Sequence, residues 1–251
     1  MDPKGMEPHG LAMEAFFDGD TNAELSVCRD DGLEESIPVR HFFRHASQFT
    51  PVENAALELC RGLVLDVGAG SGLHSLLLQE KGVRVTSIDI SPHAVKIMKQ
   101  RGVKDARCAD IFEFQGGPYH TLLLLGHGIG MAGTIAGLDC FLAHAQGLVS
   151  ADGQVLLDSL DVRATDNPNH MAYQEANREA GRYVGENRLR FHFHIRCQLL
   201  NAAIFHYTGL TVFDAGRLKP TLDPVMTQVT EICWNRHVIK RPFFFRIFHG
   251  T

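Results

Sequence analysis

The chain of 251 residues is long enough for one α/β domain with additions, or for one domain and a small cap, and we expect a single core. Its 45% hydrophobic and 21% charged residues are ordinary for a soluble protein, and no apolar run approaches the roughly 18 residues that span a bilayer. A net charge of -5 at pH 7 argues against a nucleic-acid protein that relies on bulk positive charge. We therefore expect a small-molecule ligand, with neither a membrane nor a nucleic acid as partner.

The six cysteines are far apart and form no C-x-x-C pair. This pattern favours buried thiols in a reducing compartment over a disulfide framework or a zinc site. The first residues, Met1 to Pro8, lack an apolar signal core. We expect a cytoplasmic protein without a metal site, and the sequence does not indicate its oligomeric state.

The first 35 residues or so are rich in Gly, Asp and Glu, with a short helical pattern at Leu11–Phe17. The acidic cluster Asp30, Asp31, Glu34 and Glu35 favours a solvated loop over a site. The basic and aromatic segment Val39–His45 follows. His41 and His45 are spaced as a metal-chelating pair on a helix, but no acid or cysteine follows at ligand spacing. We prefer a lid or packing helix. A helix over Glu53–Cys60 comes next, with Thr50 and Pro51 in the positions of N-cap and first turn.

The apolar run Leu63–Val67 predicts a buried strand, and glycines at 68, 70 and 72 lead from it into a helix at Leu73–Gln79. Glycine allows positive φ and close approach of a ligand, while the helix start points unpaired N–H groups at the turn. The dinucleotide fingerprint G-x-G-x-x-G fits poorly, because the sixth position counted from Gly68 is Leu73. The turn still predicts a nucleotide-like ligand.

Acidic residues close three successive predicted strands. Asp66 lies in the first strand, Asp89 follows Val83–Ile88, and Asp110 follows Ala106–Ala109. The carboxyl ends of parallel strands meet at one edge, where Asp89 is placed to accept hydrogen bonds from both hydroxyls of an adenosine ribose. Asp89 also begins a helix-start signal with Ser91 as N-cap, and the two roles are compatible.

A fourth strand at Tyr119–Leu125 opens into the glycine-rich loop Gly126–Gly133. In this loop His127 is either a general base or an exposed histidine without a catalytic role. A helix at Leu138–Leu148 and a fifth strand at Gln154–Leu160 follow. Beyond them a helix is expected at 170–180 and a strand at 188–196, with no clear period after about residue 197.

The motif Asp66-x-Gly68-x-Gly70-x-Gly72 and the order of elements from Gly62 to Leu160 resemble the class I S-adenosylmethionine-dependent methyltransferases. The resemblance implies an α/β, Rossmann-like, doubly wound fold. Its sheet would be mostly parallel and seven-stranded, with helices on both faces and an antiparallel last strand. We expect a cap or lid at residues 1–61, the cofactor-binding core at 62–162, and the rest of the sheet with a substrate-side insertion at 163–251.

The resemblance also implies S-adenosylmethionine as cofactor, with Asp66 near its methionine end, and Asp110 and Ile111 at its adenine. The expected cofactor-binding residues are Asp66, Gly68, Ala69, Gly70, Gly72, Asp89, Ile90, Asp110, Ile111 and Gly126. His127 is the candidate catalytic residue. The expected function is methyl transfer to a small-molecule acceptor. The alternatives are an NAD(P)-dependent oxidoreductase and a cofactor-binding protein without transferase activity.

We expect the acceptor to lie over the loop 126–133, under a roof made by residues 40–45 and 161–188. The aromatic and basic residues of these two segments suit a partly apolar acceptor with an acidic group: Arg40, Phe42, Phe43, Arg44 and Tyr183.

Overall fold

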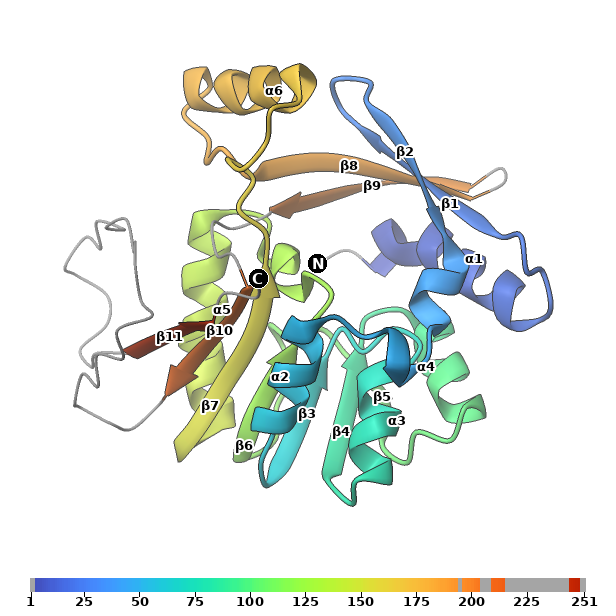
Figure 1. Cartoon of the computed structure of the whole chain (residues 1–251), viewed down its shortest axis with the longest axis vertical. Coiled ribbons are helices and arrows are strands. Elements are labelled where there is room, and N and C mark those ends of the chain that lie inside the picture. The colour runs from blue at the N-terminus through green and yellow to red at the C-terminus, as the bar shows by residue number, and fades with distance from the viewer. Residues whose placement is uncertain (1–2, 194–195, 204–208, 215–243, 249–251) are drawn as a thin grey trace.

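The computed structural model describes residues 3–193, 196–203, 209–214 and 244–248. Within these residues the strands form one sheet of seven and one sheet of four. Figure 1 shows the large sheet with helices on both sides, and the small sheet above it, beneath helix α6. The two sheets thus lie in separate layers of the molecule.

The large sheet has the strand order β11-β10-β7-β6-β3-β4-β5. Its parallel strands are β3 (Leu63–Val67), β4 (Arg84–Asp89), β5 (Ala106–Cys108), β6 (Tyr119–Leu124) and β7 (Val149–Ser159). The other two are β10 (Gly209–Asp214), antiparallel to β7, and β11 (Phe244–Phe248), antiparallel to β10. The predicted mostly parallel, Rossmann-like sheet is confirmed. The strand that opposes the parallel set is the next-to-last, β10, and β11 follows it at the edge.

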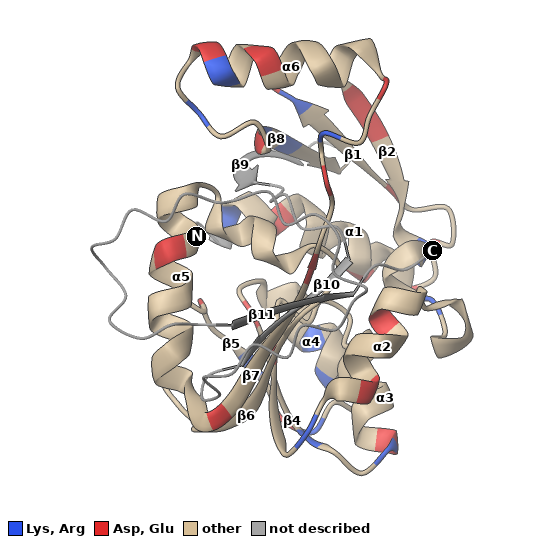
Figure 2. Cartoon of the chain, turned by 60° about the vertical axis from the view of Figure 1, so that its left-hand side comes forward, with Lys and Arg blue, Asp and Glu red and all other residues tan. Residues whose placement is uncertain are grey.

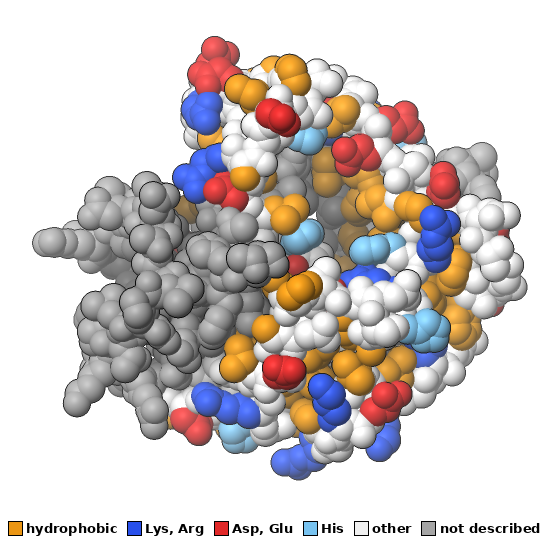
Figure 3. Space-filling model, viewed as in Figure 1, with side chains coloured by type: hydrophobic (Ala, Val, Ile, Leu, Met, Phe, Trp, Pro, Cys, Tyr) orange, Lys and Arg blue, Asp and Glu red, His pale blue; other side chains and the backbone are white. Residues whose placement is uncertain are grey.

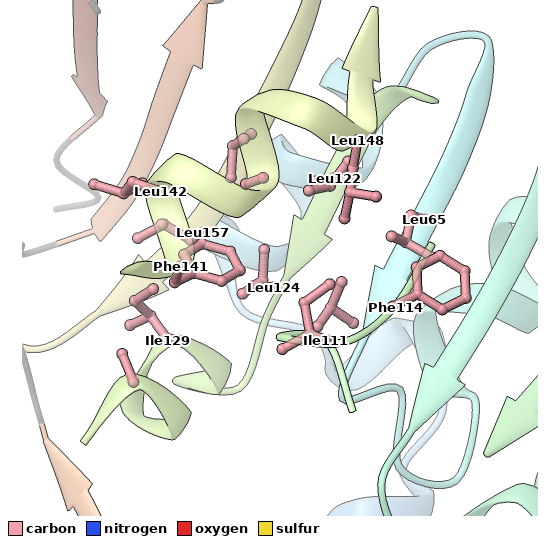
Figure 4. Packing of buried hydrophobic residues seen from close by; sticks show 14 of the residues in the cluster. Leu65, Ile111, Phe114, Leu122, Leu124, Ile129, Phe141, Leu142, Leu148 and Leu157 are labelled. Carbon is pink, nitrogen blue, oxygen red and sulfur yellow. The ribbon is translucent and has the colours of Figure 1, made fainter. Parts of the chain in front are cut away.

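Alternating apolar residues bury both faces of the parallel strands, because successive side chains in a strand point to opposite sides. On one face, Leu65 and Leu157 pack in a cluster with Phe141 of α5 (Figure 4). On the other, Val64 packs in a second cluster with Leu57 of α2. Full burial of one such side chain is worth roughly 1.5–3 kcal/mol, so the two clusters fix the sheet between its helices. These helices are α2 (Pro51–Leu59), α3 (Leu73–Glu80), α4 (Pro92–Gln100) and α5 (Ile135–Leu148).

The helix starts at Thr50 and Ser91 are confirmed. The Thr50 hydroxyl accepts a hydrogen bond from the backbone N–H of Glu53 at 3.2 Å, and Pro51 occupies the first turn. The Ser91 hydroxyl accepts one from the backbone N–H of Ala94 at 3.4 Å. Each cap satisfies a backbone donor that a helix start leaves unpaired.

The small sheet is antiparallel and has the order β2-β1-β8-β9. Its strands are β1 (Glu24–Arg29), β2 (Glu34–Pro38), β8 (Glu186–Phe193) and β9 (Arg196–Ala203). The solvated loop expected at the acidic cluster is correct in part, because β1 and β2 form a hairpin. Asp30 and Asp31 lie in its turn, whereas Glu34 and Glu35 belong to β2. All four are exposed, and Figure 2 shows acidic residues along β2 at the edge of this sheet. The residues after 162 are divided between the sheets, with β8 and β9 in the small one and β10 and β11 in the large one.

Helix α1 joins the small sheet to the large one. Met13 of α1 packs in one cluster with Leu25 of β1, Phe193 of β8 and Ile97 of α4. We call the assembly of the small sheet with η1, α1 and η2 the cap. The remaining bounds are η1 (Pro3–Met6), α1 (Glu7–Phe17), η2 (Val39–Phe43), η3 (Ala46–Gln48), η4 (Gly128–Ala132) and α6 (Pro168–Glu179). Among the described residues, no helix combines the length and the apolar character needed to cross a membrane.

Candidate active site

The carboxylate of Asp89 fixes the glycine-rich turn between β3 and α3. Its Oδ2 accepts a hydrogen bond from the backbone N–H of Gly70 at 2.9 Å, and its Oδ1 accepts one from the N–H of Ser91 at 2.8 Å. Burial raises the pKa of Asp89, and these two hydrogen bonds act in the opposite direction. Asp89 therefore shapes the turn and the start of α4 together, while its side chain lines a cavity.

Asp66 lies under the same turn and is 2% exposed. The Ser75 hydroxyl donates to its Oδ2 at 2.5 Å, and the Ser75 and Ser87 hydroxyls lie 2.7 Å apart. Burial raises the pKa of the Asp66 carboxyl. The Ser75 hydroxyl of α3 thus holds this carboxylate near the end of the first parallel strand, and Ser87 of β4 contacts Ser75 in turn.

The glycines of the predicted site have two different roles. A Cβ built on Gly70 or Gly126 meets no heavy atom within 4 Å, and both residues border the cavity with φ of 56° and 67°. A Cβ built on Gly72 would lie 2.7 Å from Cγ2 of Val103. Gly70 and Gly126 therefore leave room for a ligand, whereas Gly72 allows α3 to pack closely on the chain after α4.

One cavity of about 1320 Å³ brings the predicted residues together. Every predicted cofactor-binding residue except Gly72 lines it, and so does His127. Figure 3 shows a hollow between the two layers, with hydrophobic and histidine side chains around it. Ligand pockets usually measure about 300–1,000 Å³, so this one has room for a nucleoside-sized ligand and a second small molecule.

The cap supplies an apolar wall on the far side of the cavity. Its side chains come from η1, α1, the β1–β2 hairpin, η2 and β8, and include Met6, Phe16, Leu25, Ile37, Phe42, Phe43 and Phe191. His9 of α1 belongs to this wall and packs edge-on against Phe42, with ring centroids 4.7 Å apart. Burial lowers the pKa of His9 to about 4. Its Nδ1 is buried and has no hydrogen-bond partner within the described part of the chain.

His127 and Asp158 form a pair in the loop after β6. The backbone N–H of His127 donates to Oδ1 of Asp158 at 2.9 Å, and its Nδ1 lies 3.3 Å from Oδ2. Burial raises the pKa of Asp158, while the neighbouring His127 acts to lower it. His127 is 45% exposed and Asp158 11%, so the histidine ring is the accessible member of the pair.

A second polar group, the roof cluster, lies nearby and consists of His41, Arg44, Glu53 and His74. Arg44 donates to both the carbonyl oxygen of His41, at 2.9 Å, and the Glu53 carboxylate. The Nε2 of His74 lies 2.9 Å from Oε1 of Glu53. Burial acts to raise the pKa of Glu53, but the hydrogen bonds from His74, Thr50 and Arg44 together lower it. The cluster fixes η2 over the large sheet.

The expected roof agrees with the structure in one segment only. Residues 40–45 line the cavity, but no residue of 161–188 does, and Tyr183 packs against the cluster around α5 instead. Arg44 is paired with Glu53, so its charge is already compensated. Within the described residues, no group of three His, Cys, Asp or Glu side chains is arranged to hold a metal ion.

Sequence reasoning missed His9, Asp158 and Phe191. Asp158 had a detectable signal, because it lies at the carboxyl end of the fifth parallel strand, as Asp89 does in the second. His9 and Phe191 gave no such signal, since only the pairing of β1 with β8 brings the N-terminal and the late segments of the cap together.

Comparison with solved structures identifies the family. The chain is 31% identical to an S-adenosylmethionine-dependent methyltransferase from Bacteroides fragilis, solved in complex with S-adenosyl-L-homocysteine. The two align over 82% of this chain and 83% of that one, with a TM-score of 0.69. The chain belongs to the class I S-adenosylmethionine-dependent methyltransferases. The cofactor of this family is S-adenosylmethionine.

Other comparisons agree over shorter spans. A family model described as a methyltransferase domain matches residues 65–122 of this methyltransferase. A ubiquinone biosynthesis O-methyltransferase from Xanthomonas oryzae is 40% identical over 53 residues, which are 21% of this chain and 22% of that protein. The structure of DesVI from Streptomyces venezuelae, at 13% identity, shares the fold with a TM-score of 0.50 over 66% of this chain and 90% of that one.

Proposed function

We propose that this methyltransferase transfers the methyl group of S-adenosylmethionine to a small-molecule acceptor held under the cap. The observation that carries the proposal is that the glycine-rich turn and the apolar wall line opposite sides of one cavity. A cofactor at the turn would leave the second half of the cavity for an acceptor. The similarity to an O-methyltransferase over 53 residues supports an oxygen acceptor.

The residues at the turn suit the cofactor. Asp89 would hold the ribose hydroxyls, Asp110 and Ile111 the adenine, and the open space at Gly70 the chain between them. When bound, S-adenosylmethionine supplies an activated methyl group whose departure leaves a neutral thioether. The protein therefore has to orient the acceptor and exclude water, and needs a base only where the acceptor carries a proton.

His127 is the candidate for that base. It lines the cavity in the loop after β6, and an Asp carboxylate contacts its ring. Residues 1–61 together with β8 and β9 would form the acceptor side, and residues 62–162 the cofactor side. We further propose a reducing, cytoplasmic location, because the cysteines are scattered through the sequence.

Family membership removes the oxidoreductase alternative, which leaves a cofactor-binding protein without transferase activity as the competitor. Calorimetric titration with S-adenosylmethionine, S-adenosyl-L-homocysteine and NAD tests the cofactor. We expect micromolar binding of the first two and none of NAD. Cell extracts supplied with the protein and radiolabelled cofactor then test transfer, and we expect label in metabolites. Label chiefly in RNA or protein would reject the small-molecule acceptor, and binding without any transfer would favour the competitor.

A further inference from the structure

His127 holds an unusual backbone conformation. Its φ is 60°, and it is the one non-glycine residue with a positive φ in the part of the chain that the structure describes. Side chains other than glycine seldom adopt this region, and residues held there often belong to functional sites. Gly126 and Gly128 flank His127, so the surrounding loop can follow the turn that this conformation imposes.

The carboxylate of Asp158 contacts His127 at two points. Oδ1 accepts the backbone N–H, and Oδ2 lies 3.3 Å from Nδ1 of the ring. A carboxylate beside Nδ1 favours the tautomer that carries its proton on that nitrogen. The other ring nitrogen, Nε2, is then left with a free electron pair at the cavity, where it can accept a proton.

The loop that carries His127 packs on the glycine-rich turn. A methyl group built on Gly68 would lie 3.4 Å from Cε of Met131, and one built on Gly128 would lie 3.7 Å from the carbonyl oxygen of Val67. His127 therefore lies beside the end of β3, where the family resemblance puts the methionine end of the cofactor.

The other charged groups near this pair are engaged with one another. His41 of η2 is close enough to His127 for their charges to interact, and burial together with the charge of Arg44 lowers the pKa of His41. Glu53 of α2 and His74 of α3 lie close enough to affect Asp158, but both belong to the roof cluster. Asp158 is thus the carboxylate that contacts the His127 ring.

We propose that Asp158 is a positioning residue that holds His127 as proton acceptor, and that the acceptor is a hydroxyl compound with an apolar body. The proposal rests on the proposed function. The acceptor oxygen forms its bond to the methyl carbon while the carbon–sulfur bond breaks and its electron pair stays on sulfur. The hydroxyl proton moves to Nε2 of His127, and water takes it from the imidazolium afterwards. The apolar wall of the cap suits the body of such a molecule.

Nuclear magnetic resonance of the protein labelled with ¹⁵N-histidine tests the pair without any turnover. The signals of His127 are assigned by their loss in His127→Asn, a change that preserves the loop because asparagine tolerates positive φ. We expect the Nδ1-protonated tautomer in the wild type. A wild-type ring protonated on Nε2 would overturn the role of Asp158 even if no Asp158 variant folds.

The variants Asp158→Asn and Asp158→Glu separate positioning from a purely structural role. In Asp158→Asn the preference for the Nδ1-protonated tautomer should be lost, because the carboxylate beside Nδ1 is gone. In Asp158→Glu the preference should return in part. A folded Asp158→Asn protein with the wild-type tautomer would contradict the proposal.

The hydroxyl class is tested with 4-nitrophenol, which turns yellow when it loses its proton. In mildly acidic buffer, with the protein saturated with S-adenosyl-L-homocysteine, the wild type should increase the yellow form several-fold over His127→Asn. Equal colour in both proteins would overturn the hydroxyl assignment. A failure of the proposed function looks different, because radiolabelled cofactor would then give no labelled metabolite in the extracts, whatever the colour of 4-nitrophenol.

Discussion

The hydroxyl of Ser71 donates a hydrogen bond to the carbonyl oxygen of Phe42, which connects the glycine-rich turn directly to η2 of the cap. Arg101 strengthens this connection. Its Nη1 donates to both the carbonyl and the hydroxyl oxygen of Ser71 at 2.7 Å, and its guanidinium lies 5.3 Å from the ring centroid of Phe43. These contacts therefore hold the glycine-rich turn and η2 together over the cavity.

Replacing Ser71 with alanine should weaken the connection between the glycine-rich turn and η2. Ser71 is 2% exposed, and loss of its hydroxyl removes the donor to the carbonyl of Phe42 and one of the two hydrogen bonds that Arg101 makes to residue 71. We expect a loss of about 1–2 kcal/mol in the free energy of unfolding, and faster amide exchange in η2. Urea titration and hydrogen-exchange mass spectrometry measure the two effects. Ser150→Ala, at the opposite edge of the sheet, is the control, and equal exchange of η2 in both variants would contradict the connection.

The substitution Asp89→Ala should weaken the binding of S-adenosyl-L-homocysteine by about 1.5–3 kcal/mol, the range for hydrogen bonds to a charged group. The same change frees the N–H groups of Gly70 and Ser91, so part of the loss comes from a less ordered turn. Calorimetry measures the affinity, with Asp152→Ala as a carboxylate deletion outside the cavity. An unchanged dissociation constant in a folded Asp89→Ala protein would leave Asp89 as a helix-start residue only.

Two glycine-to-alanine changes should have opposite profiles. In Gly72→Ala the new methyl group meets Val103, and φ is 82°, so we expect about 1–3 kcal/mol of lost stability with little change in cofactor affinity. In Gly70→Ala the methyl group meets no protein atom and enters the space for the cofactor. We expect its dissociation constant to rise roughly tenfold or more. Thermal unfolding and calorimetry on both variants decide, and identical profiles would refute the distinction.

His9 should make the protein less stable in mild acid. Its folded pKa of about 4 lies below the unfolded value of 6.5, so the unfolded chain binds the proton more readily between these values. The stabilising effect is complete above pH 6.5 and is lost as the pH falls toward 4. Because His9 as a whole residue is only half-buried, we expect roughly 1–2 kcal/mol. Urea unfolding at several pH values measures this effect. The free energy of unfolding should fall less steeply toward acid pH in His9→Phe than in His170→Phe, and parallel curves for the two variants would be contrary evidence.

The edge of the sheet that borders the cavity was predictable because its signals are local. Asp66, Asp89 and Asp110 close three neighbouring parallel strands, and the sheet order brings strand ends to one edge whatever the distant parts of the chain do. The N-caps at Thr50 and Ser91 depend only on residues within one helical turn, and both are present.

The cap was not predictable in the same way. β1 is half-buried and looks like part of a polar loop until its pairing with β8, such as Val27 opposite Phe191, is known. The neutral state of His9 depends on burial by segments from elsewhere in the chain. Tyr183 belonged to the expected roof by its position in the sequence, but tertiary packing places it against the hydrophobic cluster that includes α5.

The small sheet draws β1 and β2 from before the large parallel strands and β8 and β9 from after them. A ribosome releases the chain from its N-terminus, so β1 and β2 emerge long before β8 exists to pair with them. The parallel strands from β3 to β7 are complete by Ser159, before any of β8 has been made. The nascent protein thus has the parallel edge of the large sheet first, and the cavity above that edge is enclosed only when the late strands complete the cap.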